Sequence, residues 1–207
     1  MGLRSGLAVA GVGLAVLVSA CSTSGPGRPS DDTLVVMATA AKPVSTTTPV
    51  DDPFGFGTAG TDTVGGSIPD GQTLSPFDVT NPAIAWMDPA LLEAVQNATR
   101  TAATEGVDIR VTSGWRSRGF QQRLFDEAVQ TYGSVDIARQ YVASPDVSRH
   151  VTGQAVDIGP AAAEQWMIRN GPRFGLCQIY ANETWHFELA ADPNGVCPPL
   201  KANAAAE

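Results

Sequence analysis

Apolar and polar residues recur along the second half of the chain with two different periods, which predict both helices and strands. Helical spacing predicts a helix between Asp88, a candidate N-cap followed by Pro89, and the stop signal Gly106. Its inward stripe comprises Leu91, Leu92, Val95, Thr99 and Ala102. Residues 107–115 instead alternate in polarity, as a strand does.

The following segments continue this mixture. Ser117 is a candidate N-cap for a second helix that runs to about Gln130. The inner face of that helix would carry Leu124, Phe125 and Ala128. Further helices are expected over residues 135–143 and 161–171, with a short strand at residues 154–159 after a turn at Gly153.

Two further strands are expected at residues 176–180 and 184–189, close enough in sequence to form a hairpin. In the second strand, alternation predicts a core-facing set of Trp185, Phe187 and Leu189. His186 and Glu188 would then share the opposite face. Helices and strands mixed in this order indicate an α+β domain with a small antiparallel sheet.

The N-terminal part of the chain reads as a targeting segment followed by a linker. Residues 1–20 resemble a signal peptide, with an apolar run too short to span a membrane, and Val-Ser-Ala before Cys21 resembles a bacterial lipobox. Lipidation of Cys21 is therefore expected, and an ordinary signal peptide cleaved after Ala20 is the alternative. Residues 21–71 hold few large apolar side chains apart from the stretch 33–40, which predicts a disordered linker. Residues 72–200 would form the folded domain, and residues 201–207 a C-terminal tail.

Charge and cysteine content narrow the class of protein. The formal net charge is −8 and no basic run occurs, which argues against a protein that binds nucleic acid through its phosphates. Of the three cysteines, Cys177 and Cys197 can pair in an oxidising compartment, which leaves Cys21 for the lipid.

The chain has only two histidines, and each has acidic neighbours. His150 precedes Asp157 across the turn at Gly153, and Glu183 lies just before His186. A lone histidine is more often structural than a metal ligand. Two histidines, an aspartate and a free glutamate are, however, the parts of a catalytic zinc site. The glutamate can share a face with the second histidine only if the chain bends between them.

Three sequence blocks resemble the zinc D-alanyl-D-alanine peptidases of the VanY and VanX type. They are SGWRSRGFQQRLF at residues 113–125, SRHVTGQAVDI at residues 148–158 and ETWH at residues 183–186, in the family's order. The resemblance covers the folded domain and is greatest to VanY-type carboxypeptidases. It implies a fold of the DD-peptidase and Hedgehog type and a zinc ion (Zn2+) held by His150, Asp157 and His186.

The resemblance also implies a role for each remaining residue. Glu183 would take a proton from the attacking water and pass it to the leaving amine, with Glu188 as the rival candidate for this base. Arg116 would bind the scissile carbonyl or the substrate's carboxylate, although without the motif it would be read as a surface arginine. Gln121 points inward in the helical pattern and would contact substrate. Ser148 would either bind substrate or form part of a backbone turn.

These features together predict a zinc carboxypeptidase that removes the terminal D-alanine from peptidoglycan stem peptides. The protein would be an exported monomer, anchored to the membrane by its lipid and facing the cell wall. An endopeptidase or a D-Ala-D-Ala dipeptidase of the same family is an alternative, since pocket shape separates them. A second alternative is a lipoprotein that binds the cell wall without catalysing a reaction. The presence of Glu183 argues against this alternative, because binding alone requires no base.

Overall fold

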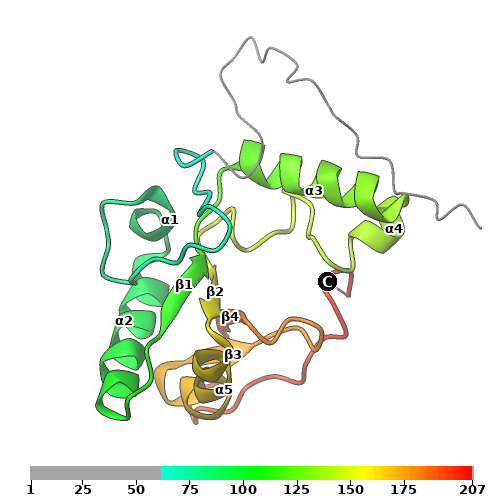
Figure 1. Ribbon diagram of the computed structural model, residues 1–207. Coiled ribbons are helices and arrows are strands. Elements are labelled where there is room, and N and C mark those ends of the chain that lie inside the picture. The colour runs from blue at the N-terminus through cyan, green and yellow to red at the C-terminus, as the bar shows by residue number, and fades with distance from the viewer. Residues whose placement is uncertain (1–61, 207) are drawn as a thin grey trace, which may run out of the picture. The chain divides into compact units, whose positions relative to one another are not determined.

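A computed structural model describes residues 62–206 of the chain (Figure 1). The expected signal peptide, Cys21, the stretch 33–40 and most of the expected linker lie outside these residues. Residues 62–71, assigned to the linker by composition, belong to the packed chain, because Ser67 is buried and Asp62 pairs with Arg123. None of the helices described here has the length and apolar character needed to cross a membrane.

The described chain contains helices and strands in a mixed order. In sequence they are α1 (Pro82–Ala85), α2 (Pro89–Thr104), β1 (Arg110–Ser113), α3 (Arg118–Tyr132), α4 (Val135–Ala138), β2 (Ala155–Gly159), α5 (Ala161–Asn170), the 3-10 helix η2 (Gly171–Phe174), β3 (Leu176–Gln178) and β4 (His186–Leu189). The expected caps are present: the Asp88 side chain accepts hydrogen bonds from two amides of α2, and the Ser117 hydroxyl accepts one from the amide of Phe120 in α3.

The four strands form one antiparallel sheet in the order β1-β2-β4-β3, which confirms the expected α+β fold with a small antiparallel sheet. Val111 pairs with Ile158, and Val156 pairs with Phe187. All four side chains are buried in one core with residues of α2 and α5. Figure 1 shows α3 and α4 set apart from α2 and α5, with the strands between them.

The opposite face of the sheet is polar. Asp157 of β2 pairs directly with His186 of β4 and lies opposite Ser113 of β1 on its other side. Side chains of directly paired residues project from the same face of a sheet. The register therefore places these three polar side chains in a row across the face that α2 and α5 leave uncovered.

The expected helix at residues 135–143 is much shorter in the structure, where α4 ends at Ala138. Past Ala138 the chain forms turns, since the amides of Gln140 and Tyr141 donate to carbonyls three residues back. The carbonyl of Ala143 also accepts a hydrogen bond from the Gln121 side chain, at 2.8 Å, which holds this segment toward the polar face.

The prediction that three apolar residues of β4 face the core is wrong for two of them. Phe187 is fully buried, whereas Trp185 and Leu189 are each 42% exposed. The strand begins only at His186, so Trp185 lies in the preceding turn and is not held by the alternation of the sheet. Leu189 is the last residue of the strand, where the sheet ends.

The expected disulfide between Cys177 and Cys197 is present, with Cα atoms 5.6 Å apart. It joins β3 to the segment that follows the sheet. That segment continues along the sheet edge, because the amide of Lys201 donates to the carbonyl of Ile179, at 2.9 Å, and the amide of Ala181 donates to the carbonyl of Lys201, at 2.8 Å.

Loss of this disulfide should destabilise the domain. The bridge closes a loop with a sequence separation of 20 residues, for which the loss of chain entropy in the unfolded state corresponds to about 3 kcal/mol. A chain carrying Cys177→Ser and Cys197→Ser should therefore show that decrease in the free energy of unfolding, measured by urea denaturation. In a Cys21→Ser chain unfolded without reductant, a thiol assay should find no free thiol; two thiols per chain would contradict the pairing.

Candidate metal centre and active site

Three side chains from separate segments meet on the polar face of the sheet. Asp157 and His186 come from the adjacent strands β2 and β4. His150 comes from the turn that precedes β2, which Gly153 closes with a φ of +73°. All three are buried, with exposed fractions of 4 to 6%. They could hold a metal ion, because each offers one ligand atom to the same small space.

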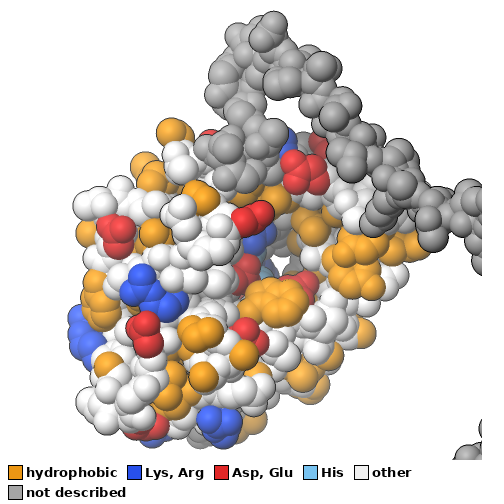
Figure 2. Space-filling view, in the orientation of Figure 1, with side chains coloured by type: hydrophobic (Ala, Val, Ile, Leu, Met, Phe, Trp, Pro, Cys, Tyr) orange, Lys and Arg blue, Asp and Glu red, His pale blue; other side chains and the backbone are white. Residues whose placement is uncertain are grey.

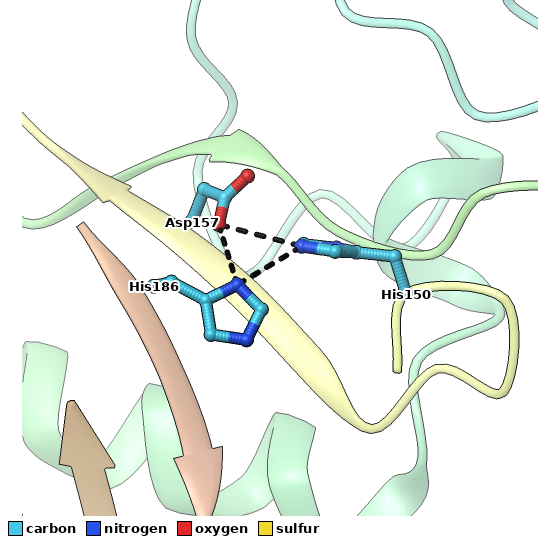
Figure 3. A group of neighbouring side chains, drawn as sticks. All are labelled: His150, Asp157 and His186. Carbon is cyan, nitrogen blue, oxygen red and sulfur yellow. Dashed lines mark hydrogen bonds and ion pairs between the residues drawn. The ribbon is translucent and has the colours of Figure 1, made fainter. Parts of the chain in front are cut away.

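The three ligand atoms form a nearly equilateral triangle (Figure 3). Nε2 of His150 lies 3.3 Å from Nδ1 of His186 and 3.4 Å from Oδ1 of Asp157, and the third side measures 3.3 Å. Tetrahedral zinc with ligand distances of about 2.0–2.1 Å requires ligand atoms about 3.3–3.4 Å apart. The side chains are therefore already spaced as a tetrahedral zinc site requires.

Hydrogen bonds outside the triangle fix the tautomer of each histidine. Nδ1 of His150 donates to the carbonyl of Gly114, at 2.8 Å, and Nε2 of His186 donates to Oε1 of Glu188, at 3.0 Å. The other nitrogen of each ring then presents its lone pair to the triangle, the arrangement usual for metal-bound histidines. A side chain at Gly114 would bring its Cβ within 2.1 Å of a backbone carbonyl oxygen, so glycine is required at this position.

Asp157 supplies the third lone pair, and its Oδ1 is buried without a hydrogen-bond partner among the described residues. Burial alone would raise the pKa of Asp157, but His150, His186 and Arg116 outweigh it and hold the pKa well below its usual range. For His150, burial lowers the pKa, and the charge of Arg116 lowers it further. A carboxylate and two imidazole lone pairs directed at one point require a cation there, so the donor set fits a metal ion.

In the absence of metal, a proton can take the cation's place at His186. Burial would lower the pKa of His186, but the carboxylate of Asp157, whose Oδ1 lies 3.3 Å from Nδ1, and the hydrogen bond with Glu188 outweigh it and raise the pKa to about 9. Glu183 lies next to this ring, with Oε2 3.8 Å from Nδ1 of His186. Burial raises the pKa of the Glu183 carboxyl to about 7, against the lowering effect of His186.

The bend expected between Glu183 and His186 is present. The amide of Glu183 donates to the carbonyl of Tyr180, and the amide of His186 donates to the carbonyl of Glu183, each at 3.3 Å. These bonds form successive turns just before β4 begins. The Thr184 hydroxyl also donates to Glu164 of α5, at 2.6 Å, which anchors the turn. Glu183 can therefore lie beside His186 although a continuous strand would separate them.

Arg116 is a half-buried residue with three partners, unlike the surface arginine of the alternative interpretation. Its Nη2 donates to Oδ2 of Asp157, at 3.0 Å, its Nη1 to Oε1 of Gln121, at 3.1 Å, and its Nε to the hydroxyl of Ser113, at 2.8 Å. Gln121 points inward as expected and is 1% exposed. Both ends of its amide are in use, since the nitrogen donates to Ala143.

A cavity of about 200 Å³ lies over the cluster and is lined by its three residues together with Glu183 and Ser148. Figure 2 shows a hollow on this face with acidic and basic side chains inside it and hydrophobic side chains along its margin. Among the lining residues that sequence reasoning missed are Tyr180, Trp185 and Ala204. Their positions depend on the turn before β4 and on the disulfide-linked segment, for which no local sequence signal exists.

A buried His-Asp-His cluster beside a glutamate of raised pKa, on the open face of a small antiparallel sheet, is typical of metal-dependent hydrolases. Residues 85–192, more than half of the chain, match the VanY family, described as D-alanyl-D-alanine carboxypeptidase, and the chain belongs to this family.

Known proteins with related activities are similar to this chain. A D-alanyl-D-alanine carboxypeptidase of Enterococcus faecalis is 30% identical over 118 residues, which cover 45% of this chain and only 44% of that protein. A solved structure of a vancomycin resistance D,D-pentapeptidase VanY mutant in complex with Zn(II) has 28% identity and a TM-score of 0.47, covering 49% of this chain and 71% of that chain. A D,D-dipeptidase VanXYg in complex with a D-Ala-D-Ala phosphinate analog has 26% identity and a TM-score of 0.49, covering 59% and 57%.

The stability of the metal-free chain should fall as pH rises from 7 to 9. The pKa of His186 rises from 6.5 to about 9 on folding, so the stability that its proton contributes is fully present below pH 6.5 and lost as pH approaches 9. Glu183, with a pKa raised from 4.5 to about 7, acts in the same direction below pH 7. The thermal midpoint of the EDTA-treated chain should therefore decrease over this range.

Two controls identify the responsible group. The zinc-loaded chain should lack this decrease, because bound metal displaces the His186 proton. His186→Ala should also lack it. A metal-free midpoint that is constant or rises between pH 7 and 9 would contradict the raised pKa of His186.

Proposed function

We propose that the protein is a zinc-dependent carboxypeptidase that removes the terminal D-alanine from peptidoglycan stem peptides. The observation that carries this proposal is the triangle of buried ligand atoms, with sides of 3.3–3.4 Å and Glu183 beside it. Family membership supports the peptidase chemistry and the D-alanyl substrate. His150, Asp157 and His186 are the proposed ligands. A bound zinc ion supplies Lewis acidity, which polarises a carbonyl group and lowers the pKa of water.

Glu183 is the proposed general base and acid. Hydrolysis breaks the peptide C–N bond: the hydroxyl of water joins the carbonyl carbon, and a proton must reach the departing nitrogen. A pKa of about 7 allows the Glu183 carboxylate to take a proton from water near neutral pH and to release it to the amine. Glu188 is less suited to this role, because it is already bonded to Nε2 of His186, the nitrogen outside the ligand triangle.

Arg116 is proposed to position Asp157 as well as to bind substrate. Its bond to Oδ2 leaves Oδ1 directed at the ligand triangle. Arg116 also lines the cavity over the cluster, where its charge is available to a scissile carbonyl or a terminal carboxylate. Burial lowers the pKa of this guanidinium, and the nearby Asp157 and Glu183 raise it. The proposed substrate contacts of Gln121 and Ser148 rest on their place in the same lining.

The N-terminal sequence supports action at the cell wall. The lipobox-like residues before Cys21 and the polar composition of residues 21–61 favour a lipid anchor and a spacer, which suit a polymeric substrate. We therefore propose that the protein is exported, anchored to the membrane at Cys21 and directed toward the wall.

The proposed reaction is tested directly by mass spectrometry of a synthetic stem pentapeptide incubated with the zinc-loaded chain. Loss of one D-alanine from the C-terminus is expected. Glu183→Gln should retain one zinc per chain by metal analysis but lose about 10²–10⁴-fold in kcat, since an amide cannot accept the proton. Glu188→Gln is the matched control and should retain more activity.

Other products would assign a different activity. Internal cleavage would identify an endopeptidase, and cleavage of only free D-Ala-D-Ala would identify a dipeptidase. Zinc binding without cleavage of any of these substrates would favour the non-catalytic binder. Loss of turnover in Glu188→Gln, with full turnover in Glu183→Gln, would transfer the base to Glu188.

Arg116→Lys should weaken both metal binding and catalysis. Lysine keeps the charge but lacks the planar fork that bonds Asp157 and Gln121 together. Loss of such a contact to a metal ligand typically costs 10–100-fold in metal affinity, and kcat/KM at saturating zinc should fall about 10²–10³-fold. Arg118→Lys, at an exposed arginine paired with Asp146, should change neither quantity.

Measuring kcat and KM for Arg116→Lys on a free-acid peptide and on its C-terminal amide identifies what Arg116 binds. A fall in kcat on both peptides assigns it to the scissile carbonyl. A rise in KM on the free acid alone assigns it to the terminal carboxylate. Unchanged zinc affinity and kinetics would show that its bonds are only structural.

A further inference from the structure

Two cavities of unequal size meet at the His-Asp-His cluster. The smaller, of about 200 Å³, lies over His150, His186 and Glu183. The larger, of about 570 Å³, extends across the start of the described chain and α3. Arg116, Leu124, Asp157 and Trp185 line both cavities, so the two adjoin at the cluster. A peptide whose scissile bond lies at the cluster therefore extends into different spaces on its two sides.

The chemistry of the linings indicates which side receives the released residue. Glu183 lines only the smaller cavity, so the group proposed to protonate the departing nitrogen faces that side. The smaller cavity also holds Arg149, an exposed cation whose Nε lies 4.0 Å from Oε2 of Glu188 and which can turn toward a terminal carboxylate. Apart from Arg116 and Asp157, which line both cavities, the charged residues of the larger cavity are Asp70, Glu127 and Glu164, which would repel a carboxylate. The C-terminal residue of the substrate therefore belongs in the smaller cavity.

The smaller cavity is bounded on one side by the segment that follows the disulfide. Ala204 of this segment lines the cavity and is only 5% exposed. Its side chain packs in a small apolar cluster with Cys177, Ile179 and Tyr180. Tyr180 in turn lies against His186, with ring centroids 5.0 Å apart. The methyl group of Ala204 is thus held at a fixed place in the wall rather than on a free tail.

The disulfide explains why this segment reaches the metal-binding face. Cys177 pairs across the sheet with Glu188, which lies two residues from His186 on the same strand. Paired residues, and residues two apart on one strand, project from the same face of a sheet. The Cys177 side chain therefore points to the face that carries the cluster, and its bond to Cys197 brings the following segment to that face.

We propose that Ala204 is a specificity-determining residue, which limits the released C-terminal residue to a small one. The proposal rests on the proposed carboxypeptidase function. The cavity volume of about 200 Å³ is below the roughly 300–1,000 Å³ typical of pockets for drug-sized ligands. A larger side chain at position 204 would fill space that the substrate needs, and glycine would enlarge it.

The test compares Ala204→Gly and Ala204→Leu with the parent chain on two pentapeptides that differ only in ending with D-alanine or D-leucine. Ala204→Leu should lower kcat/KM for the D-alanine peptide by at least about 10-fold, because a single extra methylene in a pocket already changes it about 10–200-fold. Ala204→Gly should raise the relative rate on the D-leucine peptide. The effect should appear in KM while zinc content stays at one per chain.

Ala202→Leu is the matched control, because Ala202 is exposed and lines neither cavity. It should leave the ratio of the two rates unchanged. Ala204→Gly removes a methyl group and so introduces no steric clash. It therefore keeps the test valid if Ala204→Leu fails to fold. A D-alanine to D-leucine ratio that is the same in the parent, Ala204→Gly and Ala202→Leu chains would overturn the proposal.

A binding measurement separates this proposal from the proposed function. The affinities of free D-alanine and D-leucine for the zinc-loaded Glu183→Gln chain, with and without Ala204→Gly, require no turnover. Preference for D-alanine that weakens with Ala204→Gly supports the role of Ala204 even if the parent chain cleaves neither peptide. Equal preference in both chains overturns it even if the parent chain is an active carboxypeptidase.

Discussion

The site depends on one pairing, that of β2 with β4, which sets Asp157 directly opposite His186. The same register buries Val156 against Phe187 on the other face. Because a strand alternates its faces, a slip of one residue would move Asp157 into the apolar core and expose Val156. The hydrophobic face of the sheet thereby fixes the spacing of the ligand atoms on the polar face.

The cluster is held in a state that is unfavourable for the protein alone. Gly114 and Glu188 direct the histidine protons outward, and Arg116 occupies the second oxygen of Asp157. What remains is a set of electron pairs facing one another in a buried space, which costs free energy unless a cation is present. The arrangement of the site therefore lowers the stability of the folded chain, and a bound metal ion would offset this destabilisation.

Local signals were sufficient to predict much of the fold. Asp88, Ser117 and Gly153 act through bonds or dihedral angles within a few residues, so their caps and turn could be predicted from the sequence. The cluster was predicted from the combination of residue types and from the resemblance. Local signals could not predict the short α4, the exposed Trp185 or the cavity wall at Ala204. Each of these features depends on contacts between segments far apart in sequence. Alternation placed Glu188 near His186 but could not show which ring nitrogen it contacts.

Trp185 gives the protein an optical property that its chemistry does not need. Its indole is 42% exposed, precedes His186 in the chain and lines both cavities where they join. Of the other three tryptophans, none lines either cavity. A molecule that enters either cavity would replace water around this ring, so the fluorescence emission of Trp185 should respond to occupancy of the site. The protein thus carries an intrinsic, label-free reporter at the junction of its two cavities.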